Sequence, residues 1–326
     1  MSFNITHIAN REVPVVEKAF VNGEYNSVAP VLGLKSLWKK KLENSPRRMD
    51  YYNQHMYFGD TSGNVKKLST EDGTEVFNHT IHSGTVAAVV VDKGSTEYLI
   101  SCGFTDKLVK LTRPDGTNIW TFSGHTDAVN MVQFDQVSRN VYSCSSDGTV
   151  KRINSTGTEV WSFLTNAGIV MDIISIESYI YAITDNGWLI KVAKADGSEV
   201  WRTRVDTGKA RSVCGFGGNI YVGGTNDVHK LDTDGNVVWS FVPATNYELI
   251  LEIDYDENGN EVVCTSTLGY VFRLTSDGKE VLAKRVDEGS CRGLTLDTNG
   301  YIYTASDSSG ITKLDRYLSI EGYKQV

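Results

Sequence analysis

The stretch that decides the fold is VYSCSSDGTVKRINSTGTEVW, residues 141–161. It reads as a Tyr-bearing apolar strand, an Asp-Gly turn, a strand that ends in a basic and an apolar residue, a Thr-Gly turn, and a strand that carries Trp. Residues 180–201 (IYAITDNGWLIKVAKADGSEVW) and 220–239 (IYVGGTNDVHKLDTDGNVVW) repeat this order. Self-similarity at a period of about 40 residues is typical of β-propellers, in which each repeat is one four-stranded blade.

Seven such units follow one another along the chain. The apolar residue after the basic one recurs at Leu68, Leu111, Ile153, Val192, Leu231, Leu274 and Leu314. Within each unit apolar residues alternate with polar ones, which is the two-residue period of a half-buried strand. Pairs such as Asp196-Gly197 indicate tight hairpin turns, in which glycine supplies a positive φ.

The seventh unit, residues 293–317, has no Trp strand after it, but GLKSLWKKKL at residues 33–42 supplies one near the N-terminus. We therefore predict an all-β, seven-bladed β-propeller in which residues 34–42 form the outer strand of the last blade, with a short N-terminal β-hairpin extension. The predicted parts are an N-terminal segment (1–33), the propeller (34–318) and a C-terminal tail (319–326). One repeat position then holds Trp38, Phe77, Trp120, Trp161, Trp201, Trp239 and Leu282. Bulky side chains at such a position are expected to pack between blades rather than to form a functional array.

The repeats resemble two known families. The Gly-x-x-x-Trp outer strands are similar to the pyrroloquinoline-quinone-like repeats of quinoproteins. Residues 123–153 resemble a WD repeat, with Gly124-His125 and Asp147 in place, although Ile153-Asn154 stands where the Trp-Asp pair belongs. Both resemblances imply a propeller and neither implies an activity, because propellers host unrelated functions. A lipoprotein of outer-membrane barrel assembly shares the repeat type, but no lipobox precedes the ring, so we do not expect a lipid anchor.

The first 33 residues contain alternating apolar residues and an Asn22-Gly23 pair, a strong hairpin signal. The run from ITHI to VEKAFVNGE resembles modules of tail-tip, baseplate and fibre proteins of tailed bacteriophages. This resemblance implies a virion component that is made in the host cytoplasm, with other tail proteins or a host surface glycan as partners. The alternative is an N-terminal hairpin that packs on the propeller.

Composition narrows the function classes. Lysine plus arginine is 32 and aspartate plus glutamate is 40, a net charge of −8, which disfavours nucleic-acid binding. No stretch reaches the roughly 18 apolar residues of a membrane helix, and no signal peptide is visible. The five cysteines are odd in number and form no CxxC pair, so we expect reduced thiols and folding in a reducing cytoplasm.

Candidate ligand-binding residues fall in loops that a propeller gathers on one face. The loop between the second and third strands supplies Asp60, Asp106, Asp147, Asp185, Asp227 and Asp307. Aromatic rings beside Asp, Asn and Arg suit carbohydrate or peptide contact. We therefore predict ligand binding at Trp188, Tyr247, Tyr270, Asp185, Asn186 and Arg211. The alternatives are carboxylates that hydrogen-bond their own loops and ordinary residues of a wet rim.

Neither a metal, a cofactor nor a catalytic residue is predicted. Asp254, Asp256 and Asn258 copy the first half of a calcium loop, but Thr265 stands where the bidentate Glu is needed, so we expect a turn. No HExxH, GxSxG or phosphate-binding loop occurs. We expect a non-enzymatic binding or structural protein, most simply a phage virion component. The alternatives are a bacterial cytoplasmic scaffold for protein partners and a glycan-active enzyme at the propeller mouth.

Overall fold

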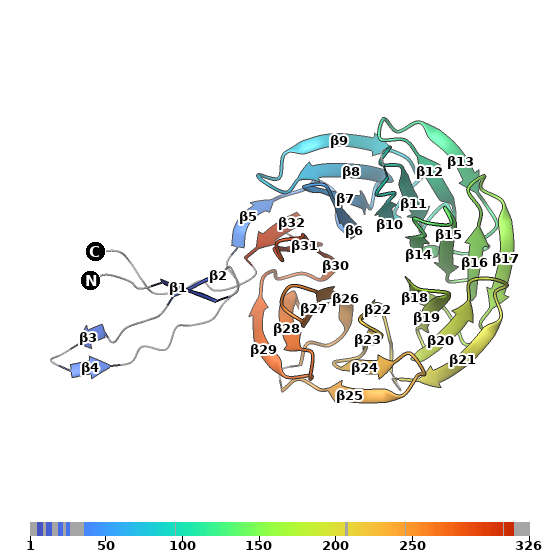
Figure 1. Cartoon of the computed structure of the whole chain (residues 1–326). Helices are drawn as coiled ribbons and strands as arrows, with labels where there is room; N and C mark the ends of the chain where they lie inside the picture. The colour runs from blue at the N-terminus through green and yellow to red at the C-terminus, as the bar shows by residue number, and fades with distance from the viewer. Residues whose placement is uncertain are drawn as a thin grey trace.

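The computed structural model describes residues 36–315, except 95, 206–207, 245 and 309, together with four short strands nearer the N-terminus. Within residues 36–315 the described chain forms seven four-stranded antiparallel sheets and no helix. Figure 1 looks along the ring axis and shows the sheets arranged as blades around that axis, where β-propellers have their central channel. The predicted seven-bladed β-propeller is therefore confirmed.

The first four blades follow one another in sequence. Blade 1 is β6 (Pro46–Tyr52), β7 (His55–Asp60), β8 (Asn64–Ser69) and β9 (Glu75–Thr80). Blade 2 is β10 (Val86–Val91), β11 (Leu99–Gly103), β12 (Val109–Thr112) and β13 (Asn118–Phe122). Blade 3 is β14 (Val129–Phe134), β15 (Val141–Ser145), β16 (Thr149–Ile153) and β17 (Glu159–Leu164). Blade 4 is β18 (Val170–Ile176), β19 (Tyr179–Thr184), β20 (Trp188–Ala193) and β21 (Glu199–Arg204).

The remaining three blades complete the ring. Blade 5 is β22 (Ser212–Phe216), β23 (Asn219–Gly223), β24 (Val228–Asp232) and β25 (Val237–Phe241). Blade 6 is β26 (Ile250–Asp256), β27 (Glu261–Ser266), β28 (Tyr270–Thr275) and β29 (Glu280–Arg285). Blade 7 is β30 (Cys291–Leu296), β31 (Ile302–Ser306), β32 (Gly310–Leu314) and β5 (Ser36–Lys40). In every blade the strand named first lies nearest the channel and the strand named last forms the outer wall (Figure 1).

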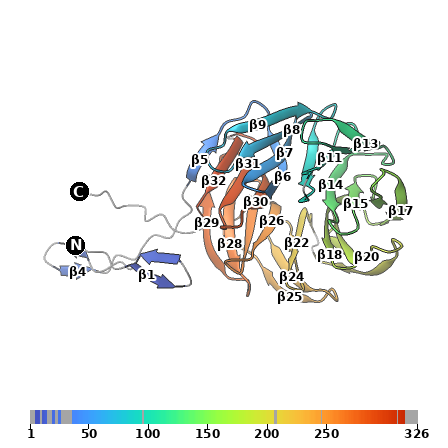
Figure 2. The same ribbon diagram turned by 45° about the horizontal axis from the view of Figure 1, so that its top comes forward.

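Ring closure follows the prediction. β5 pairs antiparallel with β32, with Trp38 opposite Lys313, so the first and last strands of the ring share one sheet. Figure 2 shows β5 alongside β32 at this junction. Pairing the two ends in one blade leaves no open edge between the first and last repeats, and such closure is how propellers protect their sheet edges.

Near the N-terminus, β1 (Ile5–Ile8) pairs with β2 (Arg11–Pro14), and β3 (Ala19–Val21) pairs with β4 (Glu24–Asn26). Val21 stands opposite Glu24, and the predicted turn at Asn22-Gly23 lies outside the described residues. The predicted boundaries at 33/34 and 318/319 lie outside the described residues.

Tryptophans of the outer strands join five of the seven blades to the next. Trp161 in blade 3 donates its Nε1–H to the carbonyl of Lys194, in the last turn of blade 4, at 3.0 Å. Gly197 in that turn has φ +75°, and a Cβ there would lie 2.7 Å from the Trp161 ring. Glycine is therefore required twice, for the backbone conformation and for the space under the indole. Trp38, Trp120, Trp201 and Trp239 each donate in the same way to Thr70, Ser155, Thr233 and Ser276.

The basic residue of the repeat strengthens this junction in four blades. Arg152 and Trp161 both donate to the carbonyl of Lys194. Lys191 and Trp201 both donate to the carbonyl of Thr233. Lys230 with Trp239, and Lys313 with Trp38, donate in the same paired way to Ser276 and Thr70. The prediction that the large residues pack between blades is confirmed, because the indoles and ammonium groups bind the neighbouring blade.

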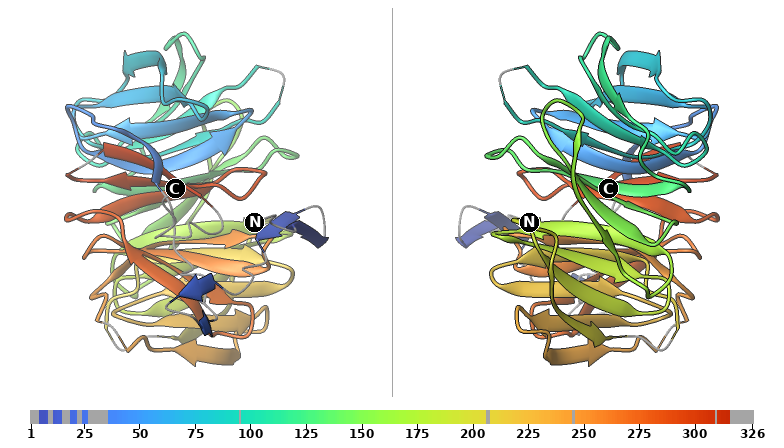
Figure 3. Two further views of the ribbon diagram at one scale, coloured as in Figure 1. Left: turned by 90° about the vertical axis from the view of Figure 1, so that its left-hand side faces the viewer. Right: turned by 90° about the vertical axis from the view of Figure 1, so that its right-hand side faces the viewer.

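The molecule has two distinct faces, seen edge-on in Figure 3. The loop face contains the loops between second and third strands and the loops between blades, such as 146–148 and 123–128. The turn face contains the other hairpins, such as 135–140 and 154–158. None of the described residues belongs to a helix that is long and apolar enough to cross a membrane.

Candidate functional site

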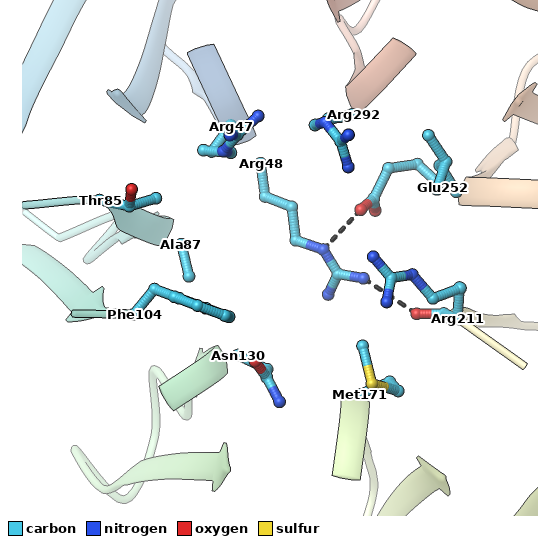
Figure 4. A pocket seen from close by; sticks show the side chains of 11 residues that line it. Arg47, Arg48, Thr85, Ala87, Phe104, Asn130, Met171, Arg211, Glu252 and Arg292 are labelled. Carbon is cyan, nitrogen blue, oxygen red and sulfur yellow. Dashed lines mark hydrogen bonds and ion pairs between the residues drawn. The ribbon is translucent and has the colours of Figure 1, made fainter. Parts of the chain in front are cut away.

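A series of β-bulges shapes the channel mouth on the loop face. The register between first and second strands shifts at Pro46/Met49, Val86/Ala88, Val129/Met131, Val170/Asp172, Ile250/Glu252 and Cys291/Gly293. A bulge leaves its extra residue unpaired and re-aims that side chain. The residues that these bulges leave unpaired are Arg47, Arg48, Ala87, Asn130, Met171, Leu251 and Arg292. All of them line a cavity of about 370 Å³, shown in close-up in Figure 4.

Arg48 crosses this cavity and connects three other blades (Figure 4). Its Nε lies 2.5 Å from Glu252 Oε1 in β26, and its Nη1 lies 2.8 Å from Asp172 Oδ1 in β18. Its Nη2 donates to the carbonyl of Arg211, just before β22, at 3.1 Å. One guanidinium from blade 1 thus joins blades 4, 5 and 6 across the channel.

Burial and charge set the ionisation of this cluster. Burial alone would lower the pKa of the Arg48 guanidinium, but Asp172 and Glu252 outweigh it and raise that pKa. Burial raises the pKa of the Asp172 carboxyl, and Arg48 opposes the rise. Burial raises the pKa of Glu252 to about 8, against the charge of Arg48 and with a contribution from Asp172. The mouth therefore holds an always-charged arginine between two carboxyls, of which Glu252 exchanges its proton near neutral pH.

Glu252 makes stability depend on pH. An unfolded Glu titrates at about 4.3. Between that value and the folded pKa of about 8, the folded state keeps a proton that the unfolded state has released. The free energy of unfolding must then fall as pH rises, with a slope of up to about 1.4 kcal/mol per pH unit. We expect urea denaturation between about pH 5 and pH 8 to show this fall and Glu252→Gln to reduce its slope. Asp254, whose pKa burial raises to about 7, contributes a remaining slope of the same sign.

The matched control is Glu71→Gln, which removes an exposed carboxylate from the turn face. A pH slope as steep in Glu252→Gln as in the unmodified protein, or one reduced equally in Glu71→Gln, would assign the titration to another group.

Three further arginines surround the Arg48 cluster. Arg47 and Arg292 share one carboxylate, since Arg47 Nη1 and Arg292 Nε lie 2.9 and 2.7 Å from the two oxygens of Asp307. The Arg211 guanidinium points into the cavity towards Arg48 (Figure 4) and donates to no residue that the structure describes. Burial lowers the pKa of Arg211, and the charges of Arg48 and Arg292 lower it further.

The six predicted ligand residues fall into three places. Arg211 alone lines the cavity. Asp185, Asn186 and Trp188 lie together in blade 4, where Asp185 accepts the Ile169 N–H at 2.9 Å and Asn186 donates to the carbonyl of Ala167. Trp188 is half-buried against the core between blades 3 and 4.

Tyr247 and Tyr270 meet in blade 6, with their ring centroids 5.0 Å apart. Tyr247 is 1% exposed, stacks on Phe272 and bonds to Glu280 through its hydroxyl. It therefore offers no exposed ring face for a ligand, because the ring fills the space between blades 5 and 6. Ligand contact at the partly exposed Trp188 and Tyr270 stays a prediction.

Sequence reasoning did not include Arg47, Arg48 and Arg292 among the predicted ligand residues, and the structure places them inside β6 and β30. It missed Asp172 and Glu252 altogether. The available signal was a charged residue third in the first strand of blades 1, 4 and 6, where other blades are apolar or small.

Two histidines form buried networks beneath the loop face. His125 Nδ1 lies 2.9 Å from Asp147, and its Nε2 lies 2.8 Å from the Ser143 hydroxyl. His82 repeats this with Asp106 and Ser101. Burial lowers the pKa of His125, so the ring is neutral, its Nδ1–H donates to Asp147 and its Nε2 accepts from Ser143. The chemistry resembles a hydrolase triad, but Ser143 is fully buried and no substrate can reach it.

Most loop aspartates serve their own loops or a neighbouring one. Asp60 accepts the N–H groups of Ser62 and Asn64, and Asp147 accepts that of Thr149. The calcium-like Asp256 forms an ion pair with the buried Arg273 at 2.6 Å. No group of three or more His, Cys, Asp or Glu residues in the described part of the chain is placed to hold a metal ion.

Comparison with known proteins agrees with this architecture. A region of 115 residues is 31% identical to the "WD repeat-containing protein 89 homolog" of Dictyostelium discoideum, covering 34% of this chain and 29% of that protein. Residues 62–183 and 146–252 each match the PQQ-type repeat family described as "Outer membrane protein assembly factor BamB". Together these matches run from residue 62 to residue 252, more than half of the 326 residues, so the chain belongs to this family of β-propeller repeats.

Proposed function

We propose that the protein is a non-enzymatic interaction platform that binds a protein partner on its loop face. The observation that carries the proposal is the unequal use of the two faces. Turns of the turn face already serve the packing between blades. Their carbonyls accept the indole N–H groups of the preceding blade, and the indole rings lie over their glycines. The loop face instead holds the arginine-lined cavity, with Phe104 52% exposed at its wall. Divergent loops on a rigid scaffold are the usual place for binding.

The setting that we propose for this platform is the virion of a tailed phage. It rests on the resemblance of the N-terminal segment to tail and baseplate modules. A bacterial cytoplasmic scaffold is the alternative setting. Mass spectrometry of purified virions separates the two, since a structural component is present in every particle and a scaffold is absent.

Site-specific photocrosslinking tests which face binds. A benzoylphenylalanine at Phe104 should crosslink one defined partner in cells, because the ring lies at the wall of the loop-face cavity. The matched control is the same amino acid at Val137, which is 94% exposed on the turn face. Trp188→Ala should weaken the captured complex by about 1–3 kcal/mol if its ring is an anchor.

Crosslinking at Val137 with none at Phe104 would contradict the proposal, as would equal crosslinking at both positions. A specific crosslink at Phe104 that is unchanged by Trp188→Ala would keep the loop face as the binding surface and remove Trp188 from the contact.

A further inference from the structure

The channel mouth holds more guanidinium groups than carboxylates. Its four arginines are Arg47, Arg48, Arg211 and Arg292. Three carboxylates contact them, because Arg48 is bound by Asp172 and Glu252, while Arg47 and Arg292 share Asp307. Four cations therefore face three anions when Glu252 is ionised, and only two when Glu252 holds its proton below its pKa of about 8, in a protein whose net charge is −8.

Arg211 carries this surplus. Its guanidinium lies among Arg48 and Arg292, and among described residues its N–H groups meet no acceptor. Burial and the charges of Arg48 and Arg292 lower the pKa of Arg211, against the opposing charges of Glu252 and Asp185, so the buried guanidinium costs free energy as it stands. An anion in the cavity would remove that cost, since an arginine fork binds a planar anion through two parallel hydrogen bonds.

The walls of the cavity select among anions. Ala87, Phe104, Met171 and Leu251 line it beside the arginines. Asp172, almost buried beside Arg48, and Glu252 when it is ionised would repel a doubly charged group more than a singly charged one. The apolar walls and these carboxyl groups fit a singly charged carboxylate on an apolar carrier better than a phosphate.

We propose that Arg211, with Arg292 beside it, binds a carboxylate of a peptide partner at the channel mouth, either an acidic side chain or a C-terminus. The inference rests on the proposed function, since the peptide belongs to the protein bound on the loop face. It assigns the partner's chemistry and makes Arg211 the specificity residue. Arg48 is already held by Asp172, Glu252 and the Arg211 carbonyl, so its role is to position the site.

Nuclear magnetic resonance of the arginine Nε–H groups tests the proposal without a known partner. The probes are N-acetyl-alanyl-leucine with a free carboxylate, the same dipeptide as its amide, and inorganic phosphate, all at constant ionic strength. We expect the acid to shift the Arg211 and Arg292 signals saturably and the amide to leave them in place. A dipeptide makes few contacts, so millimolar dissociation constants are expected.

Arg211→Gln should weaken binding of the acid at least tenfold without lowering the melting temperature, because the side chain bonds to no described residue and lies beside two like charges. Lys209→Gln is the matched control, since it removes one positive charge from the same loop outside the cavity. Equal losses in the two variants would overturn the proposal and indicate only a general electrostatic effect.

Equal shifts with acid and amide would also overturn it, as would saturation by phosphate alone, which would assign a phosphate site. These outcomes are independent of the photocrosslinking result. A partner crosslinked at Phe104 with no carboxylate binding would support the interaction platform and contradict the carboxylate site at Arg211. Carboxylate binding without any crosslinked partner would support the carboxylate site and contradict the interaction platform.

Discussion

Removing residues 1–42 is expected to destabilise the whole ring, whereas removing residues 1–33 is expected to leave it folded. The longer deletion takes away β5, and with it the ladder to β32 and the Trp38 and Lys313 junction at Thr70. Loss of a packed Trp alone costs about 3–5 kcal/mol, and a domain has only about 5–15 kcal/mol in total. Thermal melting by circular dichroism, with size-exclusion chromatography of both deletions, measures the effect.

The point variants Trp38→Ala and Leu37→Ala separate the indole from the strand. Leu37 is 41% exposed on the same strand, so its loss should change stability by no more than about 0.5 kcal/mol. An unchanged melting temperature for the longer deletion would refute closure by β5 as a source of stability.

Trp161→Ala is expected to lower the free energy of unfolding by about 3–5 kcal/mol. Its ring is 9% exposed, lies over Gly197 of the next blade and donates to the Lys194 carbonyl. Truncation would open a cavity between blades 3 and 4 and leave that carbonyl without the indole donor. Urea denaturation of the variant gives the loss, with Val160→Ala, one residue away and 48% exposed, as the control.

Trp161→Phe divides the effect into its two causes. It keeps an aromatic ring over the turn and loses the N–H donor, as blade 1 does naturally with Phe77. We expect a smaller loss than for Trp161→Ala, because a neutral hydrogen bond contributes about 0.5–1.5 kcal/mol. If Trp161→Ala and Val160→Ala cost the same, the indole does not hold the two blades together.

Much of the fold was accessible from the sequence, because propeller blades are built from local patterns. The alternation in residues 141–161, the Gly turns and the recurring Trp each depend on neighbours within one hairpin. The unmatched seventh unit and Trp38 together specified closure, since seven inner units required seven outer strands. The same local reasoning correctly assigned the tryptophans to packing.

The candidate site could be predicted only in part. Arg211 was recognised as a candidate ligand residue, but Arg48 and Glu252, which line the same cavity, were not. Tyr247 was predicted to be an aromatic residue of an exposed loop. Its ring is instead buried against Phe272, in the core between blades 5 and 6. A loop position in the sequence does not determine which way a side chain points.

The sequence by itself therefore determined the number of blades, their order, the strand that closes the ring and the packing role of the tryptophans. These follow from periodicities of two and about 40 residues, which are local or repeated. Only the tertiary structure decided the chemistry of the channel mouth. Arg48, Asp172 and Glu252 are far apart in the chain and meet only when the ring closes. Arg48 lies in a bulge of its inner strand, and Asp172 and Glu252 directly follow one, a register shift that no periodicity in the sequence encodes.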